Sequence, residues 1–179
     1  MRRMTRADTA LLLVGWQDRP LRVLAEAVRR APLERALLLR QVADRVSLPV
    51  ICTELEPRHH GRVLPQLSGA AVLDHPAFSA AAGTDLVARL TAFHVRHVVL
   101  SGIETHTLVA QTALDLVDAG FNVLVVADAC AASKPALHDL ALSRLQHGGG
   151  GVTSAEATIF EWVPEVRDPV HAELARTMR

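Results

Sequence analysis

The stretch that decides the fold is residues 97–130, HVVLSGIETHTLVAQTALDLVDAGFNVLVVADAC. Apolar residues dominate His97–Ser101, which is typical of a strand buried on both faces of a sheet. Thr105–Ala119 has a helical pattern that Gly120 ends in a C-cap position. Asn122–Ala127 is a second apolar run of strand length. A strand, a helix and another strand in this order predict a parallel β-α-β unit.

The same alternation continues on both sides of this unit. Further strands are expected at Ala10–Val14, Pro49–Thr53, Ala70–Leu73 and Val152–Thr153, and further helices at Leu21–Val46, Thr84–Phe93, Pro135–Gln146 and Ala155–Val163. We expect Pro32 to kink or divide the first helix, Thr84 to cap the second, and Glu54–Gln66 to form a surface loop. The sequence therefore predicts a doubly wound α/β fold, with a mostly parallel sheet of about six strands and helices on both faces in three layers. Residues 1–179 are expected to form one domain with a core at about 9–163.

The composition excludes several classes of partner. Formal net charge is zero and 21% of residues are charged, so nucleic acid and membranes are not expected as partners. No apolar run reaches the roughly 18–20 residues that cross a bilayer. Two cysteines, Cys52 and Cys130, make neither a disulfide framework nor a zinc pattern. We expect a cytoplasmic chain without a cofactor or a metal.

In a doubly wound sheet, the ligand site is expected outside the carboxyl ends of the strands. Four segments occupy such ends here, namely Gly15–Asp18, Thr53–His60, Ser101–Leu108 and Asp128–Lys134. The search for chemistry is therefore confined to these segments and to residues that the fold brings beside them.

Several motifs occur in a fixed order along the chain. They are Leu11–Val14 leading to Gln17, then Thr53-Glu54, Phe78-Ser79, Ser101–His106, Gln111–Leu116, Gly120-Phe121 and Val125–Cys130. In this order they resemble the isochorismatase-like hydrolases over roughly Thr9–Val163. Thr53–Pro57 and Thr153–Glu156 are most similar to the small isochorismatase-domain proteins of unassigned substrate.

The resemblance implies a cysteine hydrolase with an aspartate and a lysine beside the nucleophile. In such an enzyme the thiolate attacks an amide carbonyl, and backbone N–H groups beside a non-proline cis peptide form the oxyanion hole. Carried over by position, the aspartate slot is Gly15, the lysine slot is His75 and the cysteine slot is Leu108. All three are replaced, so we predict no confident catalytic residue. Candidates for the pocket and oxyanion hole are Ile103, Glu104, Leu108, Gln17 and Phe78.

Neighbouring residues are weak substitutes for the missing side chains. Asp18 lies three residues past its slot, Thr107 adjoins Leu108 on a different helix face, and Lys134 is far along the chain. Glu104 and His106 match the family motif and are expected to be structural. His59 and His60 are interpreted as an exposed loop pair, not as metal ligands. Cys130 is interpreted as a small core residue and Cys52 as core within a strand.

Two functions follow from this pattern. The first is a catalytically degenerate family member that binds a small ligand or serves as an interaction protein, since members of a catalytic unit act together. The alternative is a hydrolase of a small amide or ester that uses His75, with Glu104 or Cys130 as further candidates. A dinucleotide-binding domain is disfavoured because no G-x-G-x-x-G follows the first strand. The resemblance also implies a homo-oligomer, a dimer or larger.

Overall fold

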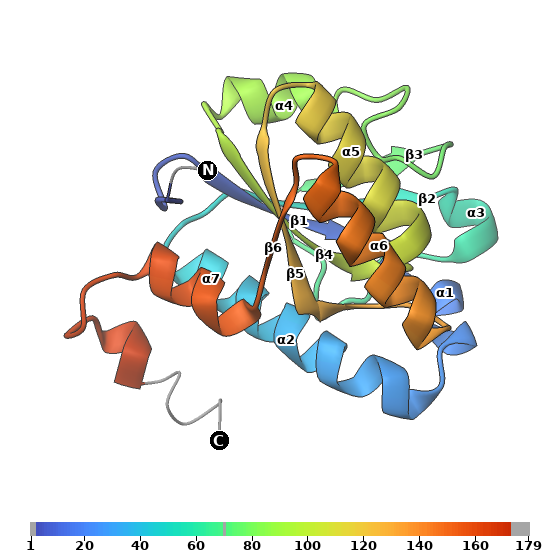
Figure 1. Ribbon diagram of the computed structural model, residues 1–179, viewed down its shortest axis with the longest axis horizontal. Helices are drawn as coiled ribbons and strands as arrows, with labels where there is room; N and C mark the ends of the chain where they lie inside the picture. The colour runs from blue at the N-terminus through green and yellow to red at the C-terminus, as the bar shows by residue number, and fades with distance from the viewer. Residues whose placement is uncertain (1–2, 70, 173–179) are drawn as a thin grey trace.

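The chain folds around a six-stranded sheet with the strand order β3-β2-β1-β4-β5-β6 (Figure 1). The computed structural model describes residues 3–69 and 71–172. The strands are β1 (Thr9–Val14), β2 (Val50–Leu55), β3 (Ala71–His75), β4 (His97–Ile103), β5 (Asn122–Ala131) and β6 (Gly151–Thr153). Each neighbouring pair is parallel, so the predicted parallel sheet of about six strands is confirmed.

Helices cover both faces of this sheet, as predicted (Figure 1). They are α1 (Asp18–Val23), α2 (Glu26–Arg45), α3 (Pro57–His60), α4 (Leu86–Ala92), α5 (Ala110–Asp118), α6 (Pro135–His147) and α7 (Ala155–Trp162), with a π-helical turn, η1 (Thr105–Val109), directly before α5. Helices α2 and α7 pack on one face, and α4, α5 and α6 on the other. Within the described residues, no helix is both long and apolar enough to cross a membrane.

Strand β1 lies in the middle of the sheet, and its side chains are part of the hydrophobic core on each face. Leu11 and Leu13 face the helices α2 and α7, whereas Leu12 and Val14 face the helices α4, α5 and α6. Every residue of β1 is buried, which explains why its sequence is a continuous apolar run and not an alternating one. That 1–179 form a single domain with a core at 9–163 stays a prediction.

The first helical region is divided, but Pro32 is not the point of division. Helix α1 ends at Val23, and the backbone is extended at Leu24 and Ala25 before α2 begins. Pro32 lies inside α2, so the expected division at this residue is wrong. A proline there removes one backbone hydrogen bond, while the alanine-, leucine- and arginine-rich residues that follow favour a continuous helix.

Several other boundaries differ from the sequence prediction, and β2, β4 and β5 each run further than expected, to Leu55, Ile103 and Ala131. The expected loop at 54–66 contains the short helix α3, and β3 extends two residues further, to His75. Ala70, the expected first residue of that strand, lies outside the described residues. Thr84 is not the N-cap of α4, because the helix begins at Leu86 and the Thr84 hydroxyl accepts a hydrogen bond from the Leu86 amide in a local turn (3.2 Å).

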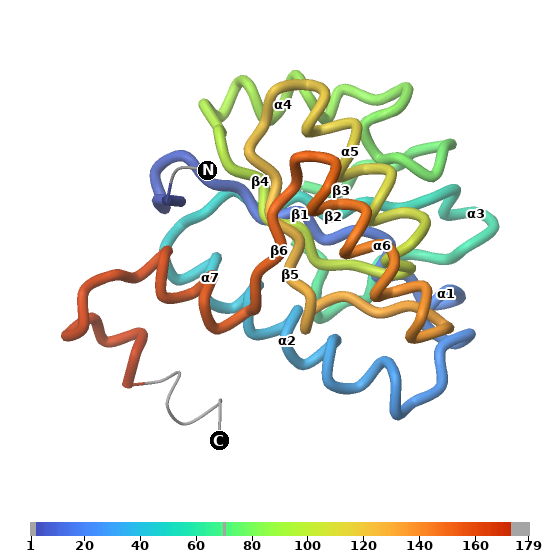
Figure 2. The backbone as a smooth tube through the Cα atoms, in the orientation of Figure 1, coloured from blue at the N-terminus to red at the C-terminus, as the bar shows by residue number. Residues whose placement is uncertain are grey.

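The strand order creates a switch point at the carboxyl end of β1. Strand β2 pairs with one edge of β1, and β4 later pairs with its other edge. The short helices α1 and α3 lie side by side at this end, as the backbone trace shows (Figure 2). In doubly wound sheets, this is where ligands bind.

Candidate functional site

Gly15 directly follows β1, and its backbone lies in the left-handed region with φ of +65°. A Cβ atom at this position would lie 2.2 Å from the Ile103 carbonyl oxygen and 2.8 Å from Cδ2 of Leu108. The predicted aspartate and cysteine slots are therefore neighbours in space. They are also closed: the space that an aspartate side chain would need is filled by the Ile103 backbone and the Leu108 side chain.

Leu108 lies on the π-helical turn η1, which replaces the start of the α-helix predicted at Thr105. Its side chain is buried in the same apolar cluster as Val14, Leu55 and Leu73. A π turn shifts the residues that follow it around the helix axis, and such turns occur frequently at functional sites. Here the turn places an isobutyl group, which can neither attack a carbonyl nor take a proton, against Gly15.

His75 ends β3 and is 2% exposed. Its Nδ1 is 2.6 Å from the Ala77 carbonyl oxygen, and because a carbonyl only accepts, Nδ1 carries the proton. Burial lowers the pKa of His75 below its ordinary value, so the ring is neutral at pH 7. Its Nε2 is then an acceptor, and it is buried without a hydrogen-bond partner.

Thr53 was not predicted as a site residue, although its position on β2 could have identified it. It is fully buried, and its hydroxyl has no hydrogen-bond partner in the described structure. Side chains alternate along a strand, and Ile51 and Leu55 on either side of Thr53 belong to the cluster that contains Leu108. Thr53 therefore faces the same layer as Leu108.

Glu104 adjoins the cis peptide bond that the family resemblance implies, which is the bond between Ile103 and Glu104. The Glu104 carboxylate accepts hydrogen bonds from the backbone amide and the hydroxyl of Ser133, each at 3.0 Å. Nδ1 of His106 lies 3.4 Å from the same carboxylate without hydrogen-bond alignment. Glu104 thus ties the end of β4 to the segment after β5.

Gln17 is fully buried and links three segments at the carboxyl end of the sheet. Its Nε2 donates to the carbonyl oxygens of Leu55 (3.0 Å) and Gly61 (2.6 Å), while its Oε1 accepts from the Leu55 amide (2.8 Å). The buried carboxylate of Glu54 also links segments here. It accepts hydrogen bonds from the Val63 amide at 2.7 Å and from Arg62 at 2.8 Å. These polar groups are already occupied, so Gln17 shapes the site and is not free to bind a ligand.

Phe78 and His59 lie on the surface, whereas His60, the last residue of α3, is half-buried. Phe78, predicted as a pocket residue, is 54% exposed, and His59 pairs with Glu56 at 3.1 Å on an exposed face. Within residues 3–69 and 71–172, His, Cys, Asp and Glu form no group of three or more that could hold a metal ion.

The two cysteines are poor nucleophiles in this structure. Both are buried, and burial raises the pKa of Cys52 to about 11 and that of Cys130 to about 12. The thiolate is the reactive form, and at neutral pH both groups stay protonated. Cys130 faces the site layer from β5, but its thiol is directed at the Leu100 carbonyl oxygen at 3.9 Å.

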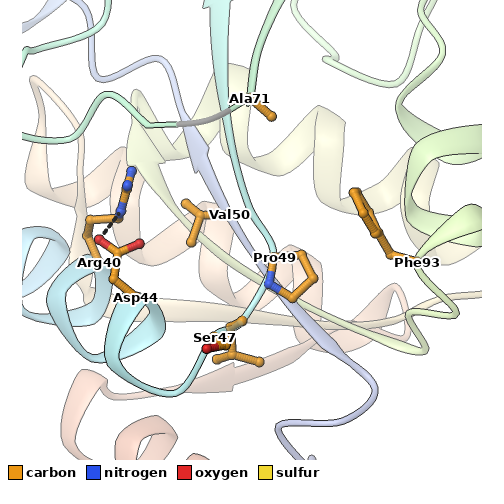
Figure 3. A pocket seen from close by; sticks show the side chains of 8 residues that line it. Arg40, Asp44, Ser47, Pro49, Val50, Ala71 and Phe93 are labelled. Atoms are coloured by element: carbon orange, nitrogen blue, oxygen red, sulfur yellow. Dashed lines mark hydrogen bonds and ion pairs between the residues drawn. The ribbon is translucent and has the colours of Figure 1, made fainter.

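A separate pocket of about 310 Å³ lies at the opposite, amino end of the strands (Figure 3). Pro49 and Val50 at the start of β2, and Ala71 at the start of β3, form part of its lining. The guanidinium of Arg40 is held there by Asp44 and by the Leu67 carbonyl oxygen, each at 2.8 Å. With its charged group already paired, this pocket offers less chemistry than the carboxyl end.

We expect the stability of the fold to decrease as pH falls below about 6.5, the ordinary pKa of histidine. The unfolded chain takes up a proton at His75 that the folded chain resists, so each such group lowers the free energy of unfolding by at most about 1.4 kcal/mol per pH unit. Urea unfolding between pH 5 and pH 8 measures this slope.

His75→Asn keeps a donor for the Ala77 carbonyl and removes the titration, so it should flatten the slope. His138, whose pKa burial also lowers, leaves a remainder. An unchanged slope in His75→Asn would contradict the assignment.

Known proteins share the domain and the fold of this chain. The model of the isochorismatase domain matches residues 9–157. Isochorismatase domain-containing protein 2 of Bos taurus is 33% identical over 154 residues, which cover 84% of this chain and 74% of that protein.

Solved structures share the same fold. The MAR1 ribonuclease of Caenorhabditis elegans superposes with a TM-score of 0.86 at 27% identity, covering 99% of this chain and 92% of that one. The YcaC gene product of Escherichia coli, described as an octameric hydrolase of unknown specificity, gives 0.90 at 24% identity, with 99% and 90% covered. The chain therefore belongs to the isochorismatase-like hydrolase family.

Proposed function

We propose that this protein is a catalytically degenerate member of its family that binds a small ligand at the carboxyl end of the sheet, or acts there as an interaction protein. The observation that carries the proposal is Gly15. Its positive φ and the 2.2 Å approach of the Ile103 carbonyl to its Cβ position leave no room for a carboxylate. The neighbouring Leu108 supplies no nucleophile. The carboxylate and the thiol of the family are therefore both missing where Gly15 and Leu108 meet.

The third replacement changes the charge of the site. A lysine ammonium in the position of His75 would be a permanent cation, whereas buried His75 is neutral at pH 7. A neutral, largely apolar site stabilises neither a thiolate nor a negatively charged reaction intermediate. This supports binding in place of the family's hydrolysis.

One observation favours the alternative, a hydrolase with altered catalytic residues. The Nε2 lone pair of His75 is unpartnered and could act as a general base toward water. Glu104 is less suited to help, because its carboxylate is bound to Ser133, and Cys130 is held protonated by burial. The alternative therefore depends on His75 alone.

The cysteines of the native protein should resist alkylation. With thiol pKa values of about 11 and 12, Cys52 and Cys130 should both remain unmodified by iodoacetamide at pH 7.5 and react fully in urea. Intact-mass spectrometry over time measures the two rates. Rapid modification of a single cysteine in the native protein would identify an activated thiol and contradict the degenerate reading.

We also propose that the chain forms a homo-oligomer and acts in the cytoplasm. Phe160 on α7 and Val166 beyond it are 47% and 89% exposed, and an interface there would cover both apolar side chains. The octameric description of the E. coli protein is a second support. The free, buried cysteines fit a reducing compartment.

Multi-angle light scattering should give a mass of at least twice the 19.3 kDa of the chain. Phe160→Glu should lower this mass, because it places a charge in an apolar contact. Gln146→Glu at an exposed polar position on α6 serves as the control for a change of surface charge alone. A monomer at micromolar concentration would contradict the proposal.

A further inference from the structure

Two polar atoms are left unpartnered in the layer that contains Gly15 and Leu108. The Thr53 hydroxyl and Nε2 of His75 are buried and bind no group in the described structure. Buried polar groups in folded proteins are nearly always hydrogen-bonded, and an unpaired one costs about 1–3 kcal/mol. Two such atoms on neighbouring strands at the expected ligand end of the sheet therefore call for a shared explanation.

The register of the sheet brings these two side chains together. Thr53 pairs with Leu73, two residues before His75, so the two side chains are diagonal neighbours on adjacent parallel strands. They face the same side, because Leu73 belongs to the Leu108 cluster and His75 follows it by two residues. A strand spacing of about 4.8 Å and a rise of about 3.3 Å per residue put their Cα atoms about 8 Å apart.

The other unpartnered buried atoms in the described residues lie in different surroundings. His97 begins β4 at the opposite end of the sheet, and Trp162 lies in the core on the other face. His106 has the Glu104 carboxylate 3.4 Å from its Nδ1. Thr53 and His75 are thus the pair that shares one face and one end of the sheet.

The hydrogen-bonding state of the pair defines the chemistry of its ligand. Nδ1 of His75 donates to Ala77, so Nε2 can only accept, whereas the Thr53 hydroxyl can donate or accept. A ligand must therefore present a donor to His75 and either function to Thr53. A carboxylate without a donor offers nothing to Nε2 of His75, so the pair disfavours such an anion.

We propose that Thr53 and His75 are the polar recognition pair of the site and select a neutral small molecule with an N–H or O–H donor and an apolar body, of the primary amide or alcohol class. The apolar side chains of Leu55, Leu73 and Leu108 lie in the layer that the pair faces and suit such a body. This inference rests on the proposed ligand-binding function.

The first test needs no ligand. Thr53→Val replaces the unpartnered hydroxyl by a methyl group of the same shape. It should stabilise the free protein and raise the equilibrium constant for folding about tenfold. Thr53→Ser keeps the hydroxyl and should not give this gain. A fall in stability on Thr53→Val would mean that the hydroxyl has a partner in the free protein, and it would overturn the proposal.

The second test compares two probes of the same shape. Isobutyramide should shift the His75 ring ¹⁵N resonances in a saturable way, while isobutyrate should bind at least about tenfold more weakly, since it lacks a donor for Nε2. Thr53→Val and His75→Asn should each weaken isobutyramide binding about tenfold, and Thr53→Ser should retain it. Absence of a shift with isobutyramide, or equal binding of isobutyrate, would overturn the proposal.

The two proposals can fail separately. Cysteine-dependent hydrolysis of an amide would refute the degenerate function but would leave the recognition pair testable by these variants. Isobutyramide binding that is insensitive to both Thr53→Val and His75→Asn would refute the recognition pair and leave the proposed function standing.

Discussion

Gly15→Ala is expected to lower the free energy of unfolding by about 3 kcal/mol or more. A left-handed backbone costs a non-glycine residue about 1–2 kcal/mol, and the added Cβ would also lie 2.2 Å from the Ile103 carbonyl oxygen. Because that oxygen belongs to the backbone of a central strand, relief requires a shift of β4. Urea unfolding followed by circular dichroism measures the loss.

Gly83→Ala is the matched control for this prediction. Gly83 has a similar φ of +71°, but a Cβ there would meet nothing within 4 Å, so its loss should be about 1 kcal/mol. The difference between the two variants isolates the steric term at the site. If Gly15→Ala cost no more than Gly83→Ala, the slot would have room for a side chain, and the claim that it is closed would be wrong.

Gln17→Ala should destabilise the protein by about 3 kcal/mol. The change leaves the Leu55 amide and the Leu55 and Gly61 carbonyl oxygens without the side chain that now binds them in a buried site. The same unfolding measurement applies, and the exposed Gln66→Ala should stay within about 0.5 kcal/mol of the wild type.

Gln17→Glu separates the hydrogen bonds from the volume of the side chain. A glutamate keeps an acceptor for the Leu55 amide but turns a carboxylate toward two carbonyl oxygens, so it should be at least as destabilising as alanine at pH 7. Lower pH should restore part of the loss, because a protonated carboxyl can donate again. A glutamate variant as stable as the wild type at pH 7 would show that the bonds to the carbonyls contribute little.

The layered fold could be predicted because its signals are local. The continuous apolar run of β1 and the strand–helix–strand pattern at 97–130 each specify one kind of structure, and parallel strands in that order leave few topologies. The division expected at Pro32 does not occur, because the strong helix formers after it outweigh a single lost hydrogen bond.

The site was harder to predict because side-chain identity does not specify backbone shape. Gly15 in the sequence means only that a carboxylate is missing, whereas the structure adds a positive φ and a blocked Cβ position. The π turn before α5 carries no local sequence signal, and the exposure of Phe78 depends on the chain around it. Thr53 could have been found by counting alternate residues along β2 and asking what a buried hydroxyl there would bind.

The central claim is that the scaffold of the family is retained while its cysteine chemistry is lost, and an amide- and ester-hydrolysis panel tests it most directly. The wild type should be compared with Cys52→Ala/Cys130→Ala and with His75→Asn. We expect none of the three proteins to exceed the uncatalysed rate, because Gly15 and Leu108 supply neither base nor nucleophile. Turnover by the wild type that disappears in the cysteine-free variant would contradict the account. Turnover that survives there but disappears in His75→Asn would establish the alternative hydrolase in its place.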